Sequence, residues 1–287
     1  MSLFIDQVTA RRLERAEGAA CAAFVEVRRR VAPEAGAEWR AVDGTFAMYD
    51  GAGSPMTQTF GLGMSAPATP EQLAELERFF TERGADTDHE VSPLAGVEVL
   101  ALLAERGYRP IELSTVLVQP LSGDDAPPAE GVPPGEDETA APAAAGLTVR
   151  ACGDERDRER FVATSVAGWA ELPELAGLLE TLARTTSQNP LMTSFLVERE
   201  GEPIATGALA IHEGVALLAG ASTIPAQRGL GAQGLLLTAR LVEARRRGCE
   251  LAMMVAAPAS TSQRNAERRG FRVAYTRTKW RLRRPAG

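Results

Sequence analysis

Apolar residues along residues 147–284 follow two different patterns, helical spacing and continuous runs. Phe161, Val162, Val166 and Trp169 repeat at helical spacing, whereas the later runs are β-branched and apolar, as strands are. Residues 251–256 are continuously apolar, which is typical of a buried parallel strand. We expect, in this order, a strand at 147–152, helices at 155–170 and 175–184, strands at 193–200, 204–212 and 215–223, a helix ending at Arg247, a strand at 251–256 and a closing helix before Gly270-Phe271.

The first half of the chain repeats the later part of this pattern. Thr69-Pro70-Glu71-Gln72 is a capping box, and it opens a helix that ends at Arg83-Gly84. A strand and a second helix are expected next, and they end at Gly107-Tyr108 much as the other half ends at Gly270-Phe271. The shared order and spacing predict a duplicated domain.

Residues 123–146 separate the two halves. This segment has no aromatic and no basic residue, and it is rich in proline, alanine and acidic residues. Because it cannot bury a core, we expect an extended linker. The predicted domains are therefore 1–122 and 147–287, joined by 123–146.

Composition narrows the classes of function. The 287 residues are 45% hydrophobic and 24% charged, with a net charge of −7. This charge disfavours general nucleic-acid binding and is compatible with cationic amine substrates. Three cysteines and two histidines predict neither a disulfide framework nor a metal site. Nothing resembles a membrane span or a secretory signal, so we expect a cytoplasmic protein without a membrane partner.

A glycine-spaced turn follows the apolar run that ends at Ile224. Gly229, Gly231 and Gly234 leave backbone N–H groups uncovered at the start of a predicted helix. The positive end of the helix dipole and these free amides suit an anionic phosphate, without any lysine. We therefore expect a phosphate-bearing ligand here.

Two nucleotide-binding patterns fit this segment less well. Residues 229–234 match G-x-G-x-x-G, but Pro225 to Arg228 intervene after the strand and too few residues follow for a doubly wound sheet. The only nearby acid, Glu250, lies at the beginning of the next strand and not at its end. No G-K-[ST] is present either. Nucleotide binding through the glycine run remains a weaker alternative.

The same residues resemble the pyrophosphate loop of the GCN5-related N-acetyltransferases, whose core is [Q/R]-x-x-G-x-[G/A]. Arg228 and Gly231 fit that core, whereas Gln233 stands where Gly or Ala is usual and is expected to hinder one backbone amide. Residues 262–271 resemble the closing helix and Gly-Phe turn of the family. The resemblance implies an α/β fold with a mixed sheet, of the acyl-CoA N-acyltransferase type, in two tandem domains.

The resemblance also implies a site for acetyl-CoA, the acyl donor. The amides of residues 228–234 would hold the pyrophosphate, and the edge of the strand at 222–224 would pair with the pantetheine arm. A backbone N–H near Thr223 would polarise the thioester carbonyl. The implied cofactor-binding residues are Ser222, Thr223, Ile224, Arg228, Gly229, Leu230, Gly231, Ala232, Gln233, Gly234 and Asn265.

Candidates for proton transfer are few. Glu213 and His212, at the turn before the strand at 215–223, are candidates for the base by residue type, and an exposed turn is the preferred explanation of both residues. The family often carries a tyrosine general acid four positions before the Gly of Gly-Phe, and Ala266 stands there. Asn265 has a residue type that is disfavoured within helices, so it either hydrogen-bonds the cofactor or the substrate or is an exposed helix residue.

The two halves differ at the predicted loop. Residues 61–70 contain two prolines, which lack N–H donors, and no arginine–glycine loop. We therefore expect a first domain that has lost cofactor binding. The predicted function is acetyl transfer from acetyl-CoA to the amine of a small molecule by a monomer, and the alternative is a non-catalytic acyl-CoA-binding or partner-binding module.

Overall fold

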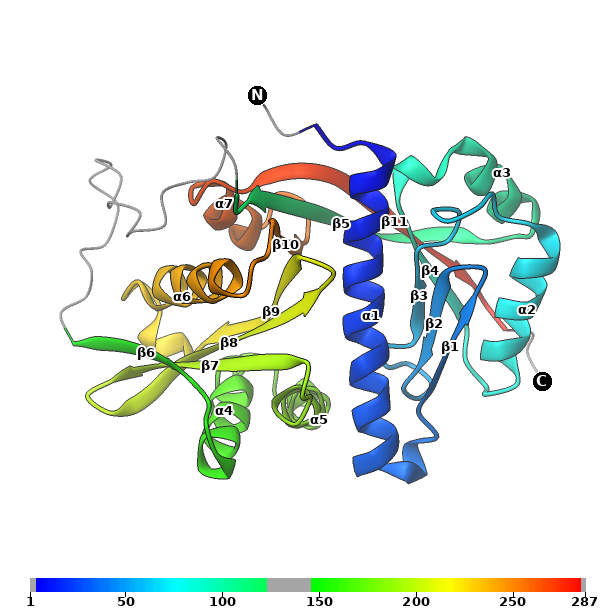
Figure 1. Ribbon diagram of the computed structural model, residues 1–287. Helices are drawn as coiled ribbons and strands as arrows, with labels where there is room; N and C mark the ends of the chain where they lie inside the picture. The colour runs from blue at the N-terminus through cyan, green and yellow to red at the C-terminus, as the bar shows by residue number, and fades with distance from the viewer. Residues whose placement is uncertain (1–3, 123–145, 285–287) are drawn as a thin grey trace. The chain divides into compact units, whose positions relative to one another are not determined.

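The computed structural model describes residues 4–122 and 146–284, which form two compact units (Figure 1). The described residues within 120–252 form one unit, called the loop unit because it holds the glycine-spaced turn. Residues 4–119 and 253–284 form the other, called the α1 unit after its long first helix. The linker expected at 123–146 lies, apart from Gly146, outside the described residues.

The loop unit is built around strands in the order β10-β9-β8-β7-β6. The pairs β6–β7, β7–β8 and β8–β9 are antiparallel, and the start of β10 lies beside the start of β9, where Glu250 N–H donates to Gly214 O at 2.8 Å. The elements are β6 (Leu147–Ala151), α4 (Glu155–Ala167), α5 (Ala176–Ser187), β7 (Met192–Arg199), β8 (Glu202–His212), β9 (Val215–Thr223), α6 (Ala232–Arg246) and β10 (Leu251–Ala256), with short 3₁₀ turns at Pro173–Leu175 and Pro225–Gln227.

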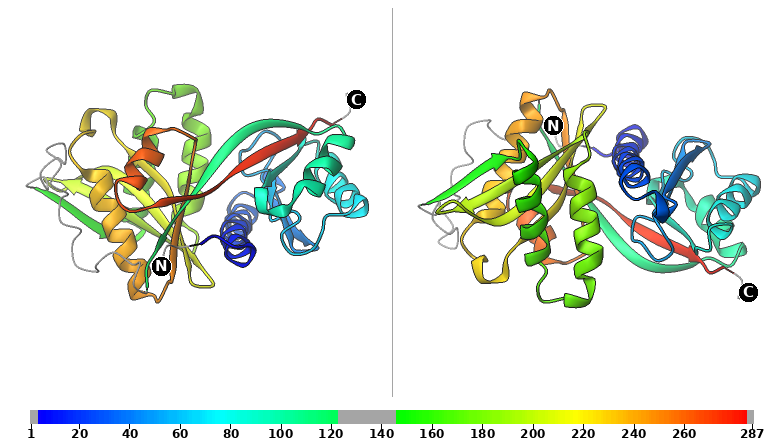
Figure 2. Two further views of the ribbon diagram at one scale, coloured as in Figure 1. Left: turned by 90° about the horizontal axis from the view of Figure 1, so that it is seen from above. Right: turned by 90° about the horizontal axis from the view of Figure 1, so that it is seen from below.

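Helices cover both faces of this sheet. In Figures 1 and 2, α6 lies on one face, and α4 and α5 lie on the other. Phe161 and Val162 of α4 pack with Leu196 of β7, while α6 buries Leu236 and Leu241 on its own side. Strands enclosed on both faces read as continuous apolar runs, which is why this part of the sequence predicts its elements well.

The strands of the α1 unit lie in the order β1-β2-β3-β4-β11-β5. Phe46 faces α1, where a side-chain atom on Gly18 would overlap its ring, and the neighbouring Ala47 belongs to the apolar cluster under α2. The elements are α1 (Gln7–Val31), β1 (Glu38–Val42), β2 (Thr45–Tyr49), β3 (Gln58–Phe60), α2 (Pro70–Thr81), β4 (Thr87–Val91), α3 (Val97–Glu105), β5 (Arg109–Pro120), α7 (Thr261–Glu267) and β11 (Arg272–Leu282), with 3₁₀ turns at Pro33–Ala35 and Pro93–Ala95.

The C-terminal segment groups with the first half of the chain, and this differs from the division expected from the sequence. β11 pairs antiparallel with β4 and with β5, for example Trp280 with His89 and Thr276 with Thr115. Trp280 and Leu282 also pack against the apolar cluster of α2. The boundary between the compact units consequently falls within β10, so the expected domain 147–287 is not one compact unit.

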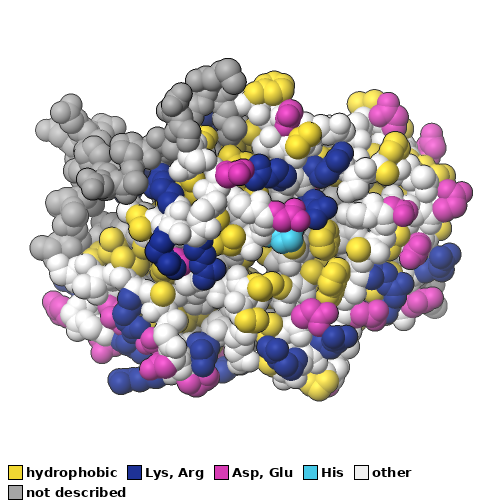
Figure 3. All heavy atoms as spheres, in the orientation of Figure 1, with side chains coloured by type: hydrophobic (Ala, Val, Ile, Leu, Met, Phe, Trp, Pro, Cys, Tyr) yellow, Lys and Arg dark blue, Asp and Glu magenta, His cyan; other side chains and the backbone are white. Residues whose placement is uncertain are grey.

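On the face shown in Figure 3, acidic and basic side chains are interspersed. Among the residues that the structure describes, no helix is both long enough and apolar enough to cross a membrane.

Candidate functional site

The start of α6 carries the predicted phosphate loop. β9 ends at Thr223, a 3₁₀ turn covers Pro225–Gln227, and α6 begins at Ala232. Gly229 and Gly231 both have φ of +83°, a backbone conformation that is strained for residues with a side chain. A Cβ built on either glycine would meet no atom within 4 Å. The backbone of this loop is therefore open.

Backbone amides at this helix start lack partners from their own helix. Gly231 is the N-cap and supplies no side chain, and the first helical hydrogen bond runs from Leu235 N–H to Gly231 O at 3.1 Å. The amides of Ala232, Gln233 and Gly234 precede it, so they are the donors that a helix leaves unsatisfied. Together with the helix dipole they form a site suited to an anion.

The Gln233 side chain turns back to β9. Its Nε2 donates to Ser222 O at 3.0 Å and to Thr223 Oγ1 at 2.7 Å. Because its polar end is held by the strand, Gln233 links the start of α6 to the end of β9. The sequence suggested only that this residue hinders an amide and did not anticipate the link.

Arg228 also connects two segments. Its Nη1 lies 2.8 Å from Glu171 Oε2, and its Nη2 donates to Gly168 O at 3.3 Å. The side chains of Arg228 and Glu171 are 49% and 62% exposed, so water screens this ion pair. The expected phosphate partner thus has a competing carboxylate beside it.

The end of α4 packs directly on the end of β9. A Cβ on Gly168 would lie 2.6 Å from Ser222 Oγ and 3.2 Å from Thr223 N, so only glycine permits this approach. Nearby, the hydroxyl of Thr206 lies 3.0 Å from that of Ser165 and 2.9 Å from that of Ser222. This hydroxyl cluster fixes the strand at the point where acyl transfer is expected.

A β-bulge interrupts β9 just before this point. Thr206 pairs with Ser222 and Ala208 pairs with Ala219, so two residues of β9, Gly220 and Ala221, oppose Gly207 alone. Gly220 has φ of +59°, and both bulge residues are exposed. The bulge was not expected from the sequence, although a glycine inside an apolar strand is its usual signal.

A buried arginine lies beneath the bulge. Arg240 of α6 is 4% exposed, and its Nη1 donates to Ala208 O at 3.4 Å and to Ala219 O at 3.3 Å, while its Nε donates to Leu236 O at 3.2 Å. Burial lowers the pKa of its guanidinium to about 10. This value is still above neutral pH, so the guanidinium stays charged there. The burial of Arg240 was not expected from the sequence either, although an arginine on the apolar side of the helix, near Leu236 and Leu241, is a signal for it.

Glu213 and His212 lie at the opposite end of β9. They form the turn before the strand, where Glu213 has φ of +46° and His212 Nε2 lies 3.7 Å from Glu213 Oε1. Thr223 ends the nine-residue strand. At about 3.3 Å per residue, roughly 25 Å separates the two ends. The structure therefore does not bring Glu213 to Thr223.

Asn265 lies on α7, in the α1 unit. Its side chain is exposed, whereas that of the adjacent Ala266 is 2% exposed. An apolar, buried residue thus occupies the position where the family resemblance places a tyrosine acid.

The corresponding segment of the α1 unit is closed. A Cβ on Gly63 would lie 2.6 Å from Val99 Cγ2, and Leu62 and Met64 on either side are buried. Thr69 Oγ1 accepts from Gln72 N–H at 3.1 Å and caps α2. This helix start is thus filled and capped where that of α6 is open.

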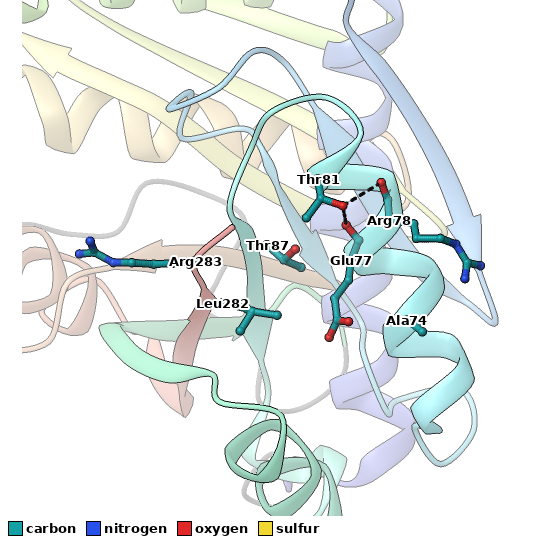
Figure 4. A pocket seen from close by; sticks show the side chains of 7 residues that line it. All are labelled: Ala74, Glu77, Arg78, Thr81, Thr87, Leu282 and Arg283. Atoms are coloured by element: carbon teal, nitrogen blue, oxygen red, sulfur yellow. Dashed lines mark hydrogen bonds between the residues drawn. The ribbon is translucent and has the colours of Figure 1, made fainter. Parts of the chain in front are cut away.

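A cavity of about 350 Å³ lies elsewhere in the α1 unit (Figure 4). Arg78 and Arg283 point away from it in Figure 4, and the Glu77 carboxylate is held by Arg106. None of the predicted cofactor residues lines it. Its lining residues are Ala74, Glu77, Arg78, Thr81, Thr87, Leu282 and Arg283. In the described ranges, no three His, Cys, Asp or Glu side chains form a group able to hold a metal ion.

Comparison with known proteins places the loop in a family. The model of the acetyltransferase (GNAT) family matches residues 158–271, which run from α4 past α7 and include the whole loop. This region, residues 158–271, therefore has the sequence pattern of the GNAT family. No curated protein matches it in sequence.

Solved structures of GNAT proteins resemble the chain beyond the family match. A GCN5-related N-acetyltransferase from Kribbella flavida is 18% identical with a TM-score of 0.61, covering 93% of this chain and 96% of that one. A tandem GNAT protein from the clavulanic acid biosynthesis pathway is 14% identical with a TM-score of 0.59, covering 92% and 89%. A GCN5-related N-acetyltransferase from Sphaerobacter thermophilus is 18% identical with a TM-score of 0.56, and the match covers 80% of this chain and 73% of that one. The expected mixed α/β fold of tandem GNAT type is confirmed.

Proposed function

We propose that this protein transfers an acetyl group from acetyl-CoA to the primary amine of a small molecule. The observation that carries the proposal is the open, uncapped start of α6 at the end of β9, inside the region that matches the family. The match to the GNAT family supports acetyl transfer as the reaction class. The acceptor class rests on the net charge of −7, which favours a cation.

The residues of the loop and of the end of β9 fit the acyl donor. The amides of residues 229–234 would receive the pyrophosphate, and the end of β9 at 222–224 would pair with the amides of the pantetheine arm. Arg228 adds a positive charge beside the loop. The cofactor contact expected of Asn265 stays a prediction from the family resemblance.

The reaction needs modest chemistry from the chain. The amine nitrogen bonds to the thioester carbon, the C–S bond breaks, the amine gives up a proton and the departing sulfur receives one. A backbone N–H at β9 would stabilise the oxyanion that forms in between. Since Glu213 lies at the far end of β9, we assign proton removal to water at the site.

The α1 unit is proposed to bind no acyl donor. Thr69 caps α2, and Pro70, at its first position, has no N–H to offer. The side chains around Gly63 fill the space that a ligand would need. One cofactor per chain is the expected stoichiometry.

A second candidate function is a non-catalytic acyl-CoA-binding module. The buried Ala266 in place of a tyrosine acid favours it. Both functions need the same loop, so only turnover separates them.

Release of free CoA from acetyl-CoA, measured with a panel of primary amines, tests the proposal. We expect one or more amines to stimulate release above the rate of hydrolysis, and Gly231→Glu to abolish the stimulation. Tight binding without stimulation by any amine would support the binding module, and absence of binding would exclude both functions.

A further inference from the structure

We propose that Arg240 is a positioning residue for acyl transfer: it holds the bulge of β9 and polarises the peptide between Ala219 and Gly220, so that the Gly220 amide binds the thioester oxygen. This inference rests on the proposed function. It concerns a residue outside the loop, on the buried side of α6.

Arg240 contacts the bulge through both strands. Its Nη1 bridges Ala208 O of β8 and Ala219 O of β9, the last pair before the bulge. A Cβ on Gly207, the residue opposite the bulge, would lie 3.2 Å from Cζ of Arg240. The guanidinium therefore occupies the space that Gly207 leaves, and it fixes the bulge from beneath.

The direction of the Gly220 amide follows from peptide geometry. The carbonyl of Ala219 and the N–H of Gly220 belong to one planar trans unit, in which they point in opposite directions. Because the carbonyl points to Arg240, the N–H points away from it. Gly220 is exposed and a Cβ there would meet only Ala208 Cβ at 3.9 Å, so there is room beside this amide for a ligand atom.

The positive charge of Arg240, close to the Ala219 carbonyl oxygen, makes the Gly220 N–H a stronger hydrogen-bond donor. Hydrogen bonds in a chain polarise one another, and the effect is larger where the dielectric constant is low. Arg240 is buried, so water does not screen its effect on the Ala219 carbonyl. The Gly220 N–H thereby becomes a better partner for a developing oxyanion.

The ionic surroundings of Arg240 are unusual for a buried cation. Among the described residues it forms no ion pair, and its polar partners are three backbone carbonyls. Burying a charge without a counter-ion is costly, and an apolar side chain of similar length would cost less. Stability alone therefore does not account for an arginine here, whereas polarisation of the bulge peptide does.

The test compares wild type with Arg240→Met and Arg240→Lys by three measurements. They are calorimetric affinity for acetyl-CoA, turnover with an accepted amine, and the ¹³C shift of bound acetyl-CoA labelled at the carbonyl. Arg246→Met, an exposed arginine on the same helix, is the matched control. Gly207→Ala is a second route, since its methyl group displaces the guanidinium while leaving the charge in place.

We expect Arg240→Met to keep the affinity within about threefold and to lose about tenfold in kcat, a part of the 10²–10³-fold loss seen when a whole oxyanion donor is removed. Its bound carbonyl shift should move toward that of free acetyl-CoA. Arg240→Lys should restore part of both effects, Gly207→Ala should weaken both, and Arg246→Met should change neither.

Two results would overturn the inference in different ways. Normal affinity with an unchanged carbonyl shift and kcat in Arg240→Met would remove the role of Arg240 and leave the proposed function intact. No binding of acetyl-CoA by wild type would exclude the proposed function and the inference with it. If Arg240→Met does not fold, unchanged shifts in both Arg240→Lys and Gly207→Ala overturn the role of Arg240, and changed shifts support it.

Discussion

Gln233 Nε2 donates a hydrogen bond to Thr223 Oγ1 at 2.7 Å, and this contact joins the start of α6 to the end of β9. The same nitrogen also donates to Ser222 O. The loop that is proposed to hold the pyrophosphate and the strand that is proposed to hold the pantetheine arm are thus fixed to each other. A donor spanning both segments meets a preformed site, which lowers the entropic cost of binding.

Replacing Gln233 by Met should loosen this link. The side chain keeps its length but loses both donors, so we expect a stability loss of about 1 kcal/mol, the typical net value of a hydrogen bond. The Kd for acetyl-CoA should rise several-fold. Denaturant unfolding and calorimetry measure the two effects, and Gln188→Met, at the C-cap of α5, serves as the control. A variant with unchanged stability and affinity would show that the link is dispensable.

Arg228 and Glu171 should have opposite effects on affinity. If Arg228 assists the phosphate, Arg228→Gln weakens acetyl-CoA binding by about 1 kcal/mol or less at an exposed site, or up to roughly fivefold. Glu171→Gln removes the competing carboxylate at 2.8 Å and should tighten binding by a similar factor. Calorimetry at low and high salt tests both variants, with smaller effects at high salt. Equal changes of the Kd in the same direction in both variants would mean that the ion pair only holds the loop in place.

His89 should make stability depend on pH. It is fully buried, with its Nδ1 2.7 Å from Thr59 Oγ1 and its Nε2 3.0 Å from Tyr108 OH. Burial lowers its pKa to about 3, whereas the unfolded chain takes up the proton below about 6.5. The unfolded state therefore binds more protons between these values, and stability is lost as the pH falls below 6.5.

The size of this effect can be measured. Between pH 7 and pH 5 the free energy of unfolding should fall by about 2 kcal/mol because of His89. The variant His89→Gln should show a pH dependence weaker by that amount, whatever its stability at pH 7. Denaturant unfolding at the two pH values gives the comparison. The same pH dependence in both proteins would contradict the assignment of a neutral, buried imidazole.

Local sequence signals predicted the elements of the loop unit closely. The strands at 215–223 and 251–256 have the predicted bounds, because they are apolar runs limited by turns and buried on both faces. The helix start at Gly231 was also readable, since the glycine spacing has a direct backbone meaning. The helix expected at 155–170 ends earlier, at Ala167, since its last turn approaches β9 at Gly168.

Long-range relationships were not readable. The pairing of β11 with β4 and β5 joins residues far apart in sequence, and no local pattern of residues 272–282 shows its partner. The role of Arg240 depends on a bulge in another element, and the Gln233 link depends on the end of β9. Each is set by tertiary packing, which periodicity does not encode.

Titration of acetyl-CoA into wild type, Gly231→Glu and Gly248→Glu shows whether the chain has one acyl-donor site, at the start of α6. Gly248 follows the other end of α6, has φ of +75° and, like Gly231, has no atom within 4 Å of a built Cβ. Both variants thus bear similar backbone strain, and only one places a carboxylate at the loop. We predict about one equivalent bound by wild type and by Gly248→Glu, with binding lost in Gly231→Glu. No binding by wild type, undiminished binding by Gly231→Glu, or two equivalents per chain would contradict the account.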